Sequence, residues 1–477
     1  MRHRSNVGYV PPAAIAALVG LWWFGCYLAT LGPGATWAND GADSGDLLAA
    51  LLTGGIPHPS GYPSYLLLGR AALALPLGGA ALRVGLLWAA CAAAAAATLA
   101  WTAAQLSGEP RWVAGVVAGG LFGGAAIVWS QAVIGEVYAL HALLAALLLA
   151  LVALGARWRG AWAVAALALG NHLTAAPLVA AWAWRRRGAG AGWQYAACAA
   201  LTIALYAWLL LLARGGPPVS WGDATTPDRL LWLVSGAAYR PLVFAADAAT
   251  LRARLGELMG DATHWMALWL AAALGGYGAW RRRAAPRALL PGLAACAGIA
   301  LFALLYDAPS WRLYLAPPLA SGCLLAGVGG AELVRCCGRW RALAGGALAA
   351  AIGIAILATW PLVDASTDHR AAQYADAVMG QAPRGALVLT VSDEATFPLW
   401  YTHFGLGRRD DLRLANETLL DFEWYRANLR RTYPDLTVPD APSGSWGDTL
   451  AARNPQIGAV CRASETAELA CFRTLGY

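Results

Sequence analysis

Residues 37–65, WANDGADSGDLLAALLTGGIPHPSGYPSY, form a polar interval between two long apolar segments. Asp43 precedes a short apolar run that Gly54 ends, so the interval predicts a helix capped by Asp43, with Asp46 in its positively charged first turn. Both positions keep a carboxylate ionised, as a general base or a metal ligand requires. The prolines on either side of His58 hold the following chain extended. Two readings stay open, a functional site or an ordinary helix cap before a polar turn.

The composition defines the class of protein in which this interval lies. Of the 477 residues, 59% are apolar and 13% are charged, and apolar runs of roughly twenty residues recur along the chain. This pattern predicts a polytopic helical membrane protein. The net charge of +7 is concentrated in short arginine clusters beside the apolar runs, so it reports membrane topology and not nucleic-acid binding. No nucleic acid is expected among the partners.

The apolar runs predict eleven membrane spans. They are 10–31, 63–79, 84–106, 112–130, 137–156, 161–184, 194–213, 263–280, 288–306, 310–330 and 342–362. Arginines orient the spans, because cytoplasmic loops carry an excess of positive charge. The arginines expected inside are Arg2, Arg4, Arg185–Arg187, Arg281–Arg283, Arg335, Arg339 and Arg341.

This orientation places two loops, 32–62 and 214–262, and the chain after residue 363 on the outer side. Arg157 and Arg159 disagree with it, because the span count puts them outside as well. Either this turn is an exception, or a segment between 107 and 136 is re-entrant. The loop 214–262 contains an amphipathic helical stretch, which is expected either to lie in the membrane interface near a lipid head group or to pack over the bundle.

The composition changes after residue 363, where apolar runs shorten to the length of strands. Strands are predicted at 385–391, 411–415 and 457–461, and helices at 395–405 and 417–430. This alternation predicts two domains, a transmembrane domain over 1–362 and a small extracytoplasmic α/β domain over 363–477. Ser392-Asp393-Glu394 follows the first strand, either as binding groups or with its Asp as the cap of the next helix. Cys461 and Cys471 are candidates for a disulfide.

Several stretches of the chain, read in order, match one known pattern. They are Asp43-Ser44-Gly45-Asp46, Gly55-Ile56-Pro57-His58-Pro59-Ser60-Gly61-Tyr62-Pro63, Gly135-Glu136-Val137-Tyr138-Ala139-Leu140-His141, Leu169-Gly170-Asn171-His172-Leu173-Thr174, Ser220-Trp221-Gly222-Asp223 and Val234-Ser235-Gly236-Ala237-Ala238-Tyr239-Arg240. On these motifs the chain resembles a family of bacterial membrane proteins of unknown function that is related to the animal transmembrane protein O-mannosyltransferase. That family is similar to the GT-C glycosyltransferases. The resemblance runs from about residue 20 to 430.

The resemblance implies an enzyme that moves a sugar, mannose or another hexose, from a polyprenyl-phosphate donor to an extracytoplasmic hydroxyl of a protein or an envelope glycan. GT-C enzymes carry an acidic residue in the first outer loop, and Asp43 matches that position, with Asp46 second. Asp46 stands where the family more often has Glu. The implied reaction is an inverting displacement in which Asp43 accepts the proton of the acceptor hydroxyl while the lipid phosphate leaves.

Other residues are expected to contact the substrates. The departing phosphate needs a cation or a hydrogen-bond donor, and Arg240 and His58 are the first choices. The expected substrate-binding residues are His58, Tyr62, Glu136, His172, Asp223, Tyr239, Arg240 and Arg312. His172 lies in an apolar segment, so it is either functional or a hydrogen-bonded packing residue. Arg312 and Asp307 flank an outer turn, where they contact a lipid head group or form a plain ion pair.

The metal requirement and two other classes of function stay open. Asp43, Asp46 and Asp223 are candidates to bind a divalent cation, although their spacing does not require one. A transporter or lipid-carrier flippase typically shows internal repeats and polar residues in mid-span, whereas the polar residues here gather in the outer loops. A non-catalytic assembly factor with the same fold is the third reading. The expected location is the cytoplasmic membrane, with membrane lipid, the lipid-linked sugar and the acceptor as partners.

Overall fold

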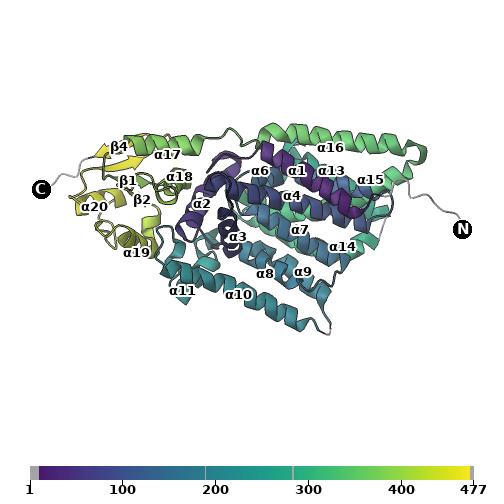
Figure 1. Ribbon diagram of the computed structural model, residues 1–477, viewed down its shortest axis with the longest axis horizontal. Helices are drawn as coiled ribbons and strands as arrows, with labels where there is room; N and C mark the ends of the chain where they lie inside the picture. The colour runs from purple at the N-terminus through teal and green to yellow at the C-terminus, as the bar shows by residue number, and fades with distance from the viewer. Residues whose placement is uncertain (1–9, 189, 261, 282–283, 473–477) are drawn as a thin grey trace.

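The computed structural model describes residues 10–188, 190–260, 262–281 and 284–472. Long helices lie side by side in one part of the molecule, and a small α/β unit lies at one end of them (Figure 1). The short helix α2 lies between the two parts, beside α18 of the α/β unit. The expected fold class, a helical polytopic membrane protein with a small C-terminal α/β part, is confirmed.

The helical part begins with α1 (Pro12–Ala29), η1 (Ala38–Asp43), α2 (Ser44–Thr53), α3 (Pro63–Leu73), α4 (Ala80–Leu106), α5 (Arg111–Gly123), α6 (Ala126–Ala132) and α7 (Tyr138–Leu154). It continues with α8 (Ala161–Asn171), η2 (Leu173–Ala175), α9 (Ala176–Arg186), α10 (Gly192–Arg214), η3 (Trp221–Asp223), α11 (Pro227–Val234), η4 (Ala237–Leu242) and α12 (Ala248–Gly260). The last members are α13 (Ala262–Arg281), α14 (Ala284–Leu305), η5 (Pro309–Leu315), α15 (Ala316–Cys336), η6 (Gly338–Trp340) and α16 (Arg341–Val363).

The C-terminal part consists of α17 (Arg370–Gln381), β1 (Leu387–Thr390), α18 (Asp393–Trp400), the π-helical turn η7 (Tyr401–Gly405), β2 (Arg413–Asn416), η8 (Leu419–Asp421), α19 (Glu423–Thr432), α20 (Trp446–Arg453), β3 (Val460–Ala463) and β4 (Leu469–Phe472). The sheet order is β2-β1-β3-β4, and β1 is parallel to both of its neighbours. The predicted alternation of strands and helices is therefore confirmed, with the second helix starting at Glu423 and not at 417. The predicted disulfide joins Cys461 of β3 to Cys471 of β4.

Six helices in the described ranges are long and apolar enough to cross a membrane, or seven if the bent pair of α5 and α6 counts as one span. The eleven predicted spans all fall on helical residues, but several of these helices are short. The helices α3 and α8 have 11 residues each, where a crossing needs about 20. Eleven full crossings therefore exceed what helix length and composition support.

The predicted span 161–184 is wrong as a single helix. His172 adopts an extended conformation, and its side chain accepts the backbone N–H of Thr174, which starts a new helical turn. At the end of α9, Nε of Arg185 donates to the carbonyl of Val152, close to the end of α7. Because α8 also starts just after α7 ends, α8 and α9 form a hairpin whose tip lies inside the bundle.

This hairpin removes the disagreement among the arginine clusters. Arg157 and Arg159 precede α8, so they lie at the same end of the bundle as Arg185 at the end of α9. Ala16 of α1 and Trp158 line one apolar groove, which places the start of α1 at this end as well. Within 107–136, α5 and α6 meet at a bend of 68°, which fits either a broken span or a re-entrant loop, so that alternative stays open. Arg2, Arg4, Arg282 and Arg283 lie outside the described residues.

The loop 214–262 packs against the C-terminal part. Trp232 of α11 makes ring contacts with Phe422 and with Trp424 of α19, at centroid separations of 5.9 and 6.0 Å. Asn428 of α19 donates to the carbonyl of Pro218 at the start of the loop. Of the two readings of the loop, packing is thus the one that the structure supports, although the partner is α19 together with the bundle. The division of the chain into domains at residue 363 stays a prediction.

Candidate active site

Two aspartates and one histidine form a continuous chain, which we call the acid–histidine chain. Oδ2 of Asp46 accepts hydrogen bonds from the backbone N–H of His58 at 2.9 Å and from Nδ1 of the same residue at 2.8 Å. Oδ1 of Asp46 accepts a hydrogen bond from the indole of Trp221 at 3.0 Å. On the other side of the imidazole, Nε2 of His58 lies 3.6 Å from Oδ2 of Asp43.

The two aspartates of this chain differ in accessibility. Asp46 is fully buried and accepts three hydrogen bonds, so both of its oxygens are occupied by protein groups. The side chain of Asp43 is 43% exposed, and its nearest ionic partner is a single imidazole nitrogen. Asp43 is therefore the carboxylate that a substrate can reach, whereas Asp46 orients His58.

The predicted cap by Asp43 is wrong. Its backbone is already in the right-handed helical region, and its side chain accepts no helix N–H, because it turns toward His58. The next segment is fixed by backbone bonds in both directions: the N–H of Ile56 donates to the carbonyl of Val219, and the N–H of Trp221 donates to the carbonyl of Ile56. These bonds hold the loop 214–262 against the segment that contains His58.

Burial and the neighbouring acids together set the pKa values in this cluster. Burial lowers the pKa of His58, but Asp43, Asp46 and Glu136 outweigh this effect and raise it to about 10, so the imidazole is a cation at neutral pH. Burial also raises the pKa of Asp43, although His58 opposes the shift. Glu136 is 2% exposed, and its pKa is raised well above the ordinary value by burial first and by Asp43 second.

Aromatic and imidazole rings lie below the acid–histidine chain. The ring of His58 contacts the ring of Tyr62 at 5.1 Å between centroids, and Tyr62 stacks on His172 at 6.1 Å. Tyr138 and Tyr314 also contact His172, at 5.9 and 5.3 Å. The structure thus brings the predicted residues Tyr62, Glu136 and His172 together with Asp43. Tyr138 and Tyr314 belong to the same cluster, although neither was among the predicted site residues. For Tyr138 the available signal was Glu136, an ionisable residue two positions earlier in the chain.

The C-terminal part reaches the same site. A Cβ on Gly45 of α2 would lie 2.5 Å from the carbonyl oxygen of Phe397, so only glycine permits this close packing of α2 on α18. Ser392 caps α18, since its hydroxyl accepts the N–H of Ala395. Asp393 remains exposed to solvent, yet desolvation by the surrounding protein, followed by the charge of Asp43, raises its pKa to about 7. The predicted cap by the Asp of 392–394 is therefore wrong, because Ser392 is the cap and Asp393 is already the first residue of α18.

Asp223 is committed to ion pairs with arginines and does not join the other two aspartates. Its Oδ2 accepts from Arg229 at 2.5 Å and its Oδ1 from Arg431 of α19 at 3.1 Å. The grouping of Asp43, Asp46 and Asp223 around a divalent cation is therefore not assembled. Among the described residues, no group of three or more His, Cys, Asp or Glu side chains is arranged to hold a metal.

The remaining candidates lie on the walls of the site or beside it. Tyr239 of η4 is within electrostatic reach of Asp43 and Asp393. Arg240, the next residue, is exposed and donates to the hydroxyl of Ser235 at 2.8 Å. Arg312 pairs with Glu257 of α12 at 3.2 Å, whereas Asp307 pairs with Arg254. The expected ion pair between Asp307 and Arg312 is therefore wrong, because α12 supplies a separate partner to each.

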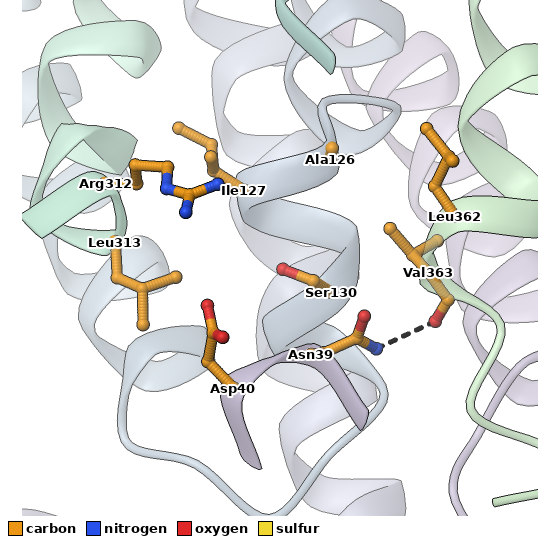
Figure 2. Close-up of a pocket in the computed structure, with 9 residues that line it drawn as sticks. All are labelled: Asn39, Asp40, Ala126, Ile127, Ser130, Arg312, Leu313, Leu362 and Val363. Atoms are coloured by element: carbon orange, nitrogen blue, oxygen red, sulfur yellow. Dashed lines mark hydrogen bonds between the residues drawn. The ribbon is translucent and has the colours of Figure 1, made fainter. Parts of the chain in front are cut away.

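A polar pocket of about 120 Å³ lies beside the site (Figure 2). It is lined by Asn39, Asp40, Ala126, Ile127, Ser130, Arg312, Leu313, Leu362 and Val363. Asn39 and Asp40 both have positive φ values, 61° and 58°, and Asn39 is held by a hydrogen bond to the carbonyl of Val363. Figure 2 shows Asp40 and Arg312 on two walls of this pocket, so both charged side chains border it.

Comparison with known structures places this fold in a class. ArnT from Cupriavidus metallidurans in the apo state aligns with a TM-score of 0.59 at 11% identity, covering 95% of this chain and 93% of ArnT. The same enzyme bound to undecaprenyl phosphate gives 0.56 at 11% identity, covering 85% and 90%. The archaeal oligosaccharyltransferase AglB from Archaeoglobus fulgidus, in complex with an inhibitory peptide and a dolichol-phosphate, gives 0.53 at 12% identity, covering 95% and 69%. The chain is a multi-pass membrane protein with the GT-C fold.

The sequence comparisons point to one branch of that class. The N-terminal domain model of protein O-mannosyl-transferase TMEM260 matches residues 43–186, and the TMEM260-associated domain 2 matches residues 371–439. The protein O-mannosyl-transferase TMEM260 of Mus musculus is 27% identical over 463 residues, covering 84% of this chain. The chain spans 62% of the length of that relative. The expected relation to the animal O-mannosyltransferase and to the GT-C superfamily is confirmed.

Proposed function

We propose that this chain is a glycosyltransferase that moves a sugar, mannose or another hexose, from a polyprenyl-phosphate donor to a hydroxyl acceptor on a protein or an envelope glycan. The single observation that supports the proposal most is the half-exposed carboxylate of Asp43 beside a protonated His58 that Asp46 orients. The relation to TMEM260 supports the sugar and the reaction type, and the lipid phosphates in the ArnT and AglB structures support the donor class.

The reaction proceeds by one displacement. The acceptor oxygen forms a bond to the anomeric carbon while the bond from that carbon to the phosphate oxygen breaks, which inverts the configuration. The proton of the acceptor hydroxyl passes to Asp43, and the electron pair of the broken bond leaves with the lipid phosphate. General-base assistance of this kind contributes roughly 10²- to 10⁴-fold in rate.

Negative charge on the leaving phosphate requires compensation in the transition state. His58 supplies a positive charge next to Asp43, and it is held in place by two hydrogen bonds to Asp46. Arg240 follows Tyr239 on η4, and Arg312 borders the polar pocket, so both are candidates for the phosphate or for the lipid head group. A guanidinium can bind a phosphate through two parallel hydrogen bonds.

We further propose that the reaction takes place on the outer face of the cytoplasmic membrane. The arginines at one end of the bundle, Arg157, Arg159 and Arg185, mark that end as cytoplasmic under the positive-inside rule. The acid–histidine chain lies at the opposite end of α7, next to the α/β part. The domain after residue 363 is then extracytoplasmic, which fits the disulfide between Cys461 and Cys471.

The test is a transfer assay with purified protein and a panel of polyprenyl-phosphate monosaccharides, in which release of the polyprenyl phosphate is measured with and without candidate acceptors. Release by the wild type but not by Asp43→Asn supports the proposal. Equal release by both proteins would exclude Asp43 as the base. Translocation of a lipid-linked sugar in proteoliposomes, without release, would favour a flippase instead.

A further inference from the structure

Four tyrosines from four separate elements surround Asp43. Tyr62 precedes α3, Tyr138 starts α7, Tyr239 lies in η4 and Tyr314 lies in η5. The carboxyl of Asp43 is within electrostatic reach of all four hydroxyls. We call this set the tyrosine collar. Tyr62 is 6% exposed and Tyr314 is 9% exposed, and the other two tyrosines are partly exposed.

The floor below the collar is polar and deeply buried. It is formed by Glu136, just before α7, by His141 in α7, and by Asn171 and His172 at the tip of the α8–α9 hairpin. His172 contacts the rings of Tyr62, Tyr138 and Tyr314, and it contacts His141 at 5.1 Å. Asn171 is tied to the start of α7, since its Nδ2 donates to the carbonyl of Val137 at 3.1 Å.

Three polar atoms of this floor have no hydrogen-bond partner in the part of the chain that the structure describes. They are Oε1 of Glu136, Nδ1 of His141 and Oδ1 of Asn171, on residues that are 2%, 1% and 0% exposed. A buried polar atom without a partner is destabilising, so native proteins rarely keep several of them together unless function requires it. Glu136 lies within electrostatic reach of Asp43, and His141 and Asn171 adjoin His172, which contacts the collar rings. The three unpartnered atoms indicate that a polar ligand completes them.

The residue types restrict what that ligand is. The collar and floor contain no arginine, so they lack the cation that a phosphate group would need. They offer aromatic rings together with groups that donate and accept single hydrogen bonds, the combination that a neutral molecule rich in hydroxyl groups requires. Burial raises the pKa of Glu136, and its unpartnered Oε1 can accept a hydrogen bond from a hydroxyl group of such a molecule.

We infer that the tyrosine collar and its floor form the subsite for the neutral hexosyl group of the donor, with Glu136 hydrogen-bonded to a sugar hydroxyl and the collar rings packed around the sugar. This inference rests on the proposed function and deepens it, because it separates the sugar subsite from the phosphate. The anomeric carbon then lies next to Asp43, and the phosphate lies beyond the collar, on the side of the arginines.

The experiment compares two probes with the purified protein in nanodiscs: undecaprenyl phosphate, and undecaprenyl phosphate carrying mannose. Binding is measured by the change in intrinsic tryptophan fluorescence. The wild type should bind the mannose-loaded lipid at least about tenfold more tightly, as expected for one well-placed hydrogen bond in a buried site. Equal affinity for the two probes would overturn the sugar subsite while leaving the donor class intact. Binding of neither probe would overturn the donor class, and the subsite with it.

Variants separate a binding role for Glu136 from a structural one. Glu136→Leu should reduce the preference for the mannose-loaded lipid to less than about threefold and keep the affinity for undecaprenyl phosphate, because Oε1, the atom assigned to the sugar, has no partner among the described residues. Tm should fall by no more than the loss of one hydrogen bond, the one from the N–H of Val137, explains. The matched control is Glu332→Leu, since Glu332 is equally buried but pairs with Arg335. It should lower Tm and leave the preference unchanged.

A structural role for Glu136 predicts the opposite pattern, in which Tm falls and both probes lose affinity in equal proportion; that result would overturn the inference. Should Glu136→Leu not fold, Glu136→Gln keeps the shape of the side chain and an acceptor for the N–H of Val137. It should bind undecaprenyl phosphate normally and still show a reduced preference for the mannose-loaded lipid.

Discussion

Asp46 accepts two hydrogen bonds from His58, one from the backbone and one from Nδ1, and this pair fixes the imidazole so that Nε2 faces Asp43. Two carboxylates three residues apart thus have different roles. One is enclosed and orients a histidine, and the other is open to a substrate. Similar arrangements occur in active sites in which a second residue, which does not itself react, orients the reacting group.

Asp43→Asn should reduce sugar transfer by about 10²- to 10⁴-fold, because the amide cannot accept the proton of the acceptor. The protein should remain folded, since the side chain is 43% exposed and makes one ionic contact of 3.6 Å. The check is the release of polyprenyl phosphate, together with Tm. Normal turnover in this variant contradicts the assignment of Asp43 as the base.

Asp46→Asn should affect stability as well as activity. Asp46 is fully buried and paired with His58, and removal of one charge from such a pair typically costs about 3–5 kcal/mol. Tm should therefore fall much further than in Asp43→Asn, which is the matched control because it removes the exposed acid from the same cation. Similar Tm values for the two variants would show that Asp46 does not have the orienting role.

The activity should depend on pH through His58. Its folded pKa of about 10 lies above the ordinary value of 6.5, so the charged imidazole and its stabilising ion pairs are fully present below about pH 6.5 and are lost as pH rises through about 10. Both kcat/KM and Tm should decline on that alkaline limb. His58→Gln should remove the limb, and an unchanged profile in that variant would assign the limb to another group.

Acidification should remove activity through Asp43. Burial raises the pKa of this base, so the acid limb should lie above the ordinary carboxyl value of 3.8. Asp393, with a pKa of about 7, adds an inflection because its ionisation places a second negative charge near Asp43. Asp393→Asn should abolish the inflection near neutral pH while leaving the limb due to Asp43 in place, which a pH profile of kcat/KM can resolve.

The α/β part should support the site through Asp223. Arg431 of α19 pairs with Asp223 at 3.1 Å, and the neighbouring Trp221 donates to Asp46. Arg431→Ala should lower kcat by about tenfold, since small displacements of catalytic groups are costly in rate. The control is Arg408→Ala, because Arg408 and its partner Asp376 are both more than half exposed and such pairs contribute less than about 1 kcal/mol. An equal effect of the two variants would argue against this support.

Much of the candidate site was predictable from residue order. The acids, the histidine and the prolines of the interval 37–65 mark it as unusual within an apolar chain, and Glu136 and His172 stand out because ionisable groups are rare in apolar segments. Asp223 and the pair of Asp307 and Arg312 could not be assigned correctly. Their ion-pair partners are Arg431, Arg254 and Glu257, which lie in other elements. The sequence around a charged residue does not show which distant side chain it pairs with.

The sequence by itself determined the class, a polytopic helical membrane protein, as well as the alternation of strands and helices after residue 363 and the pairing of Cys461 with Cys471, because these depend on local composition, on periodicity and on having few candidates. Only the tertiary structure decided which aspartate is enclosed and which is open. The hydrogen bond between Trp221 and Asp46 joins residues 175 positions apart, and the turn at His172 depends on packing inside the bundle. Contacts of that kind arise from how the elements pack, which no local pattern encodes.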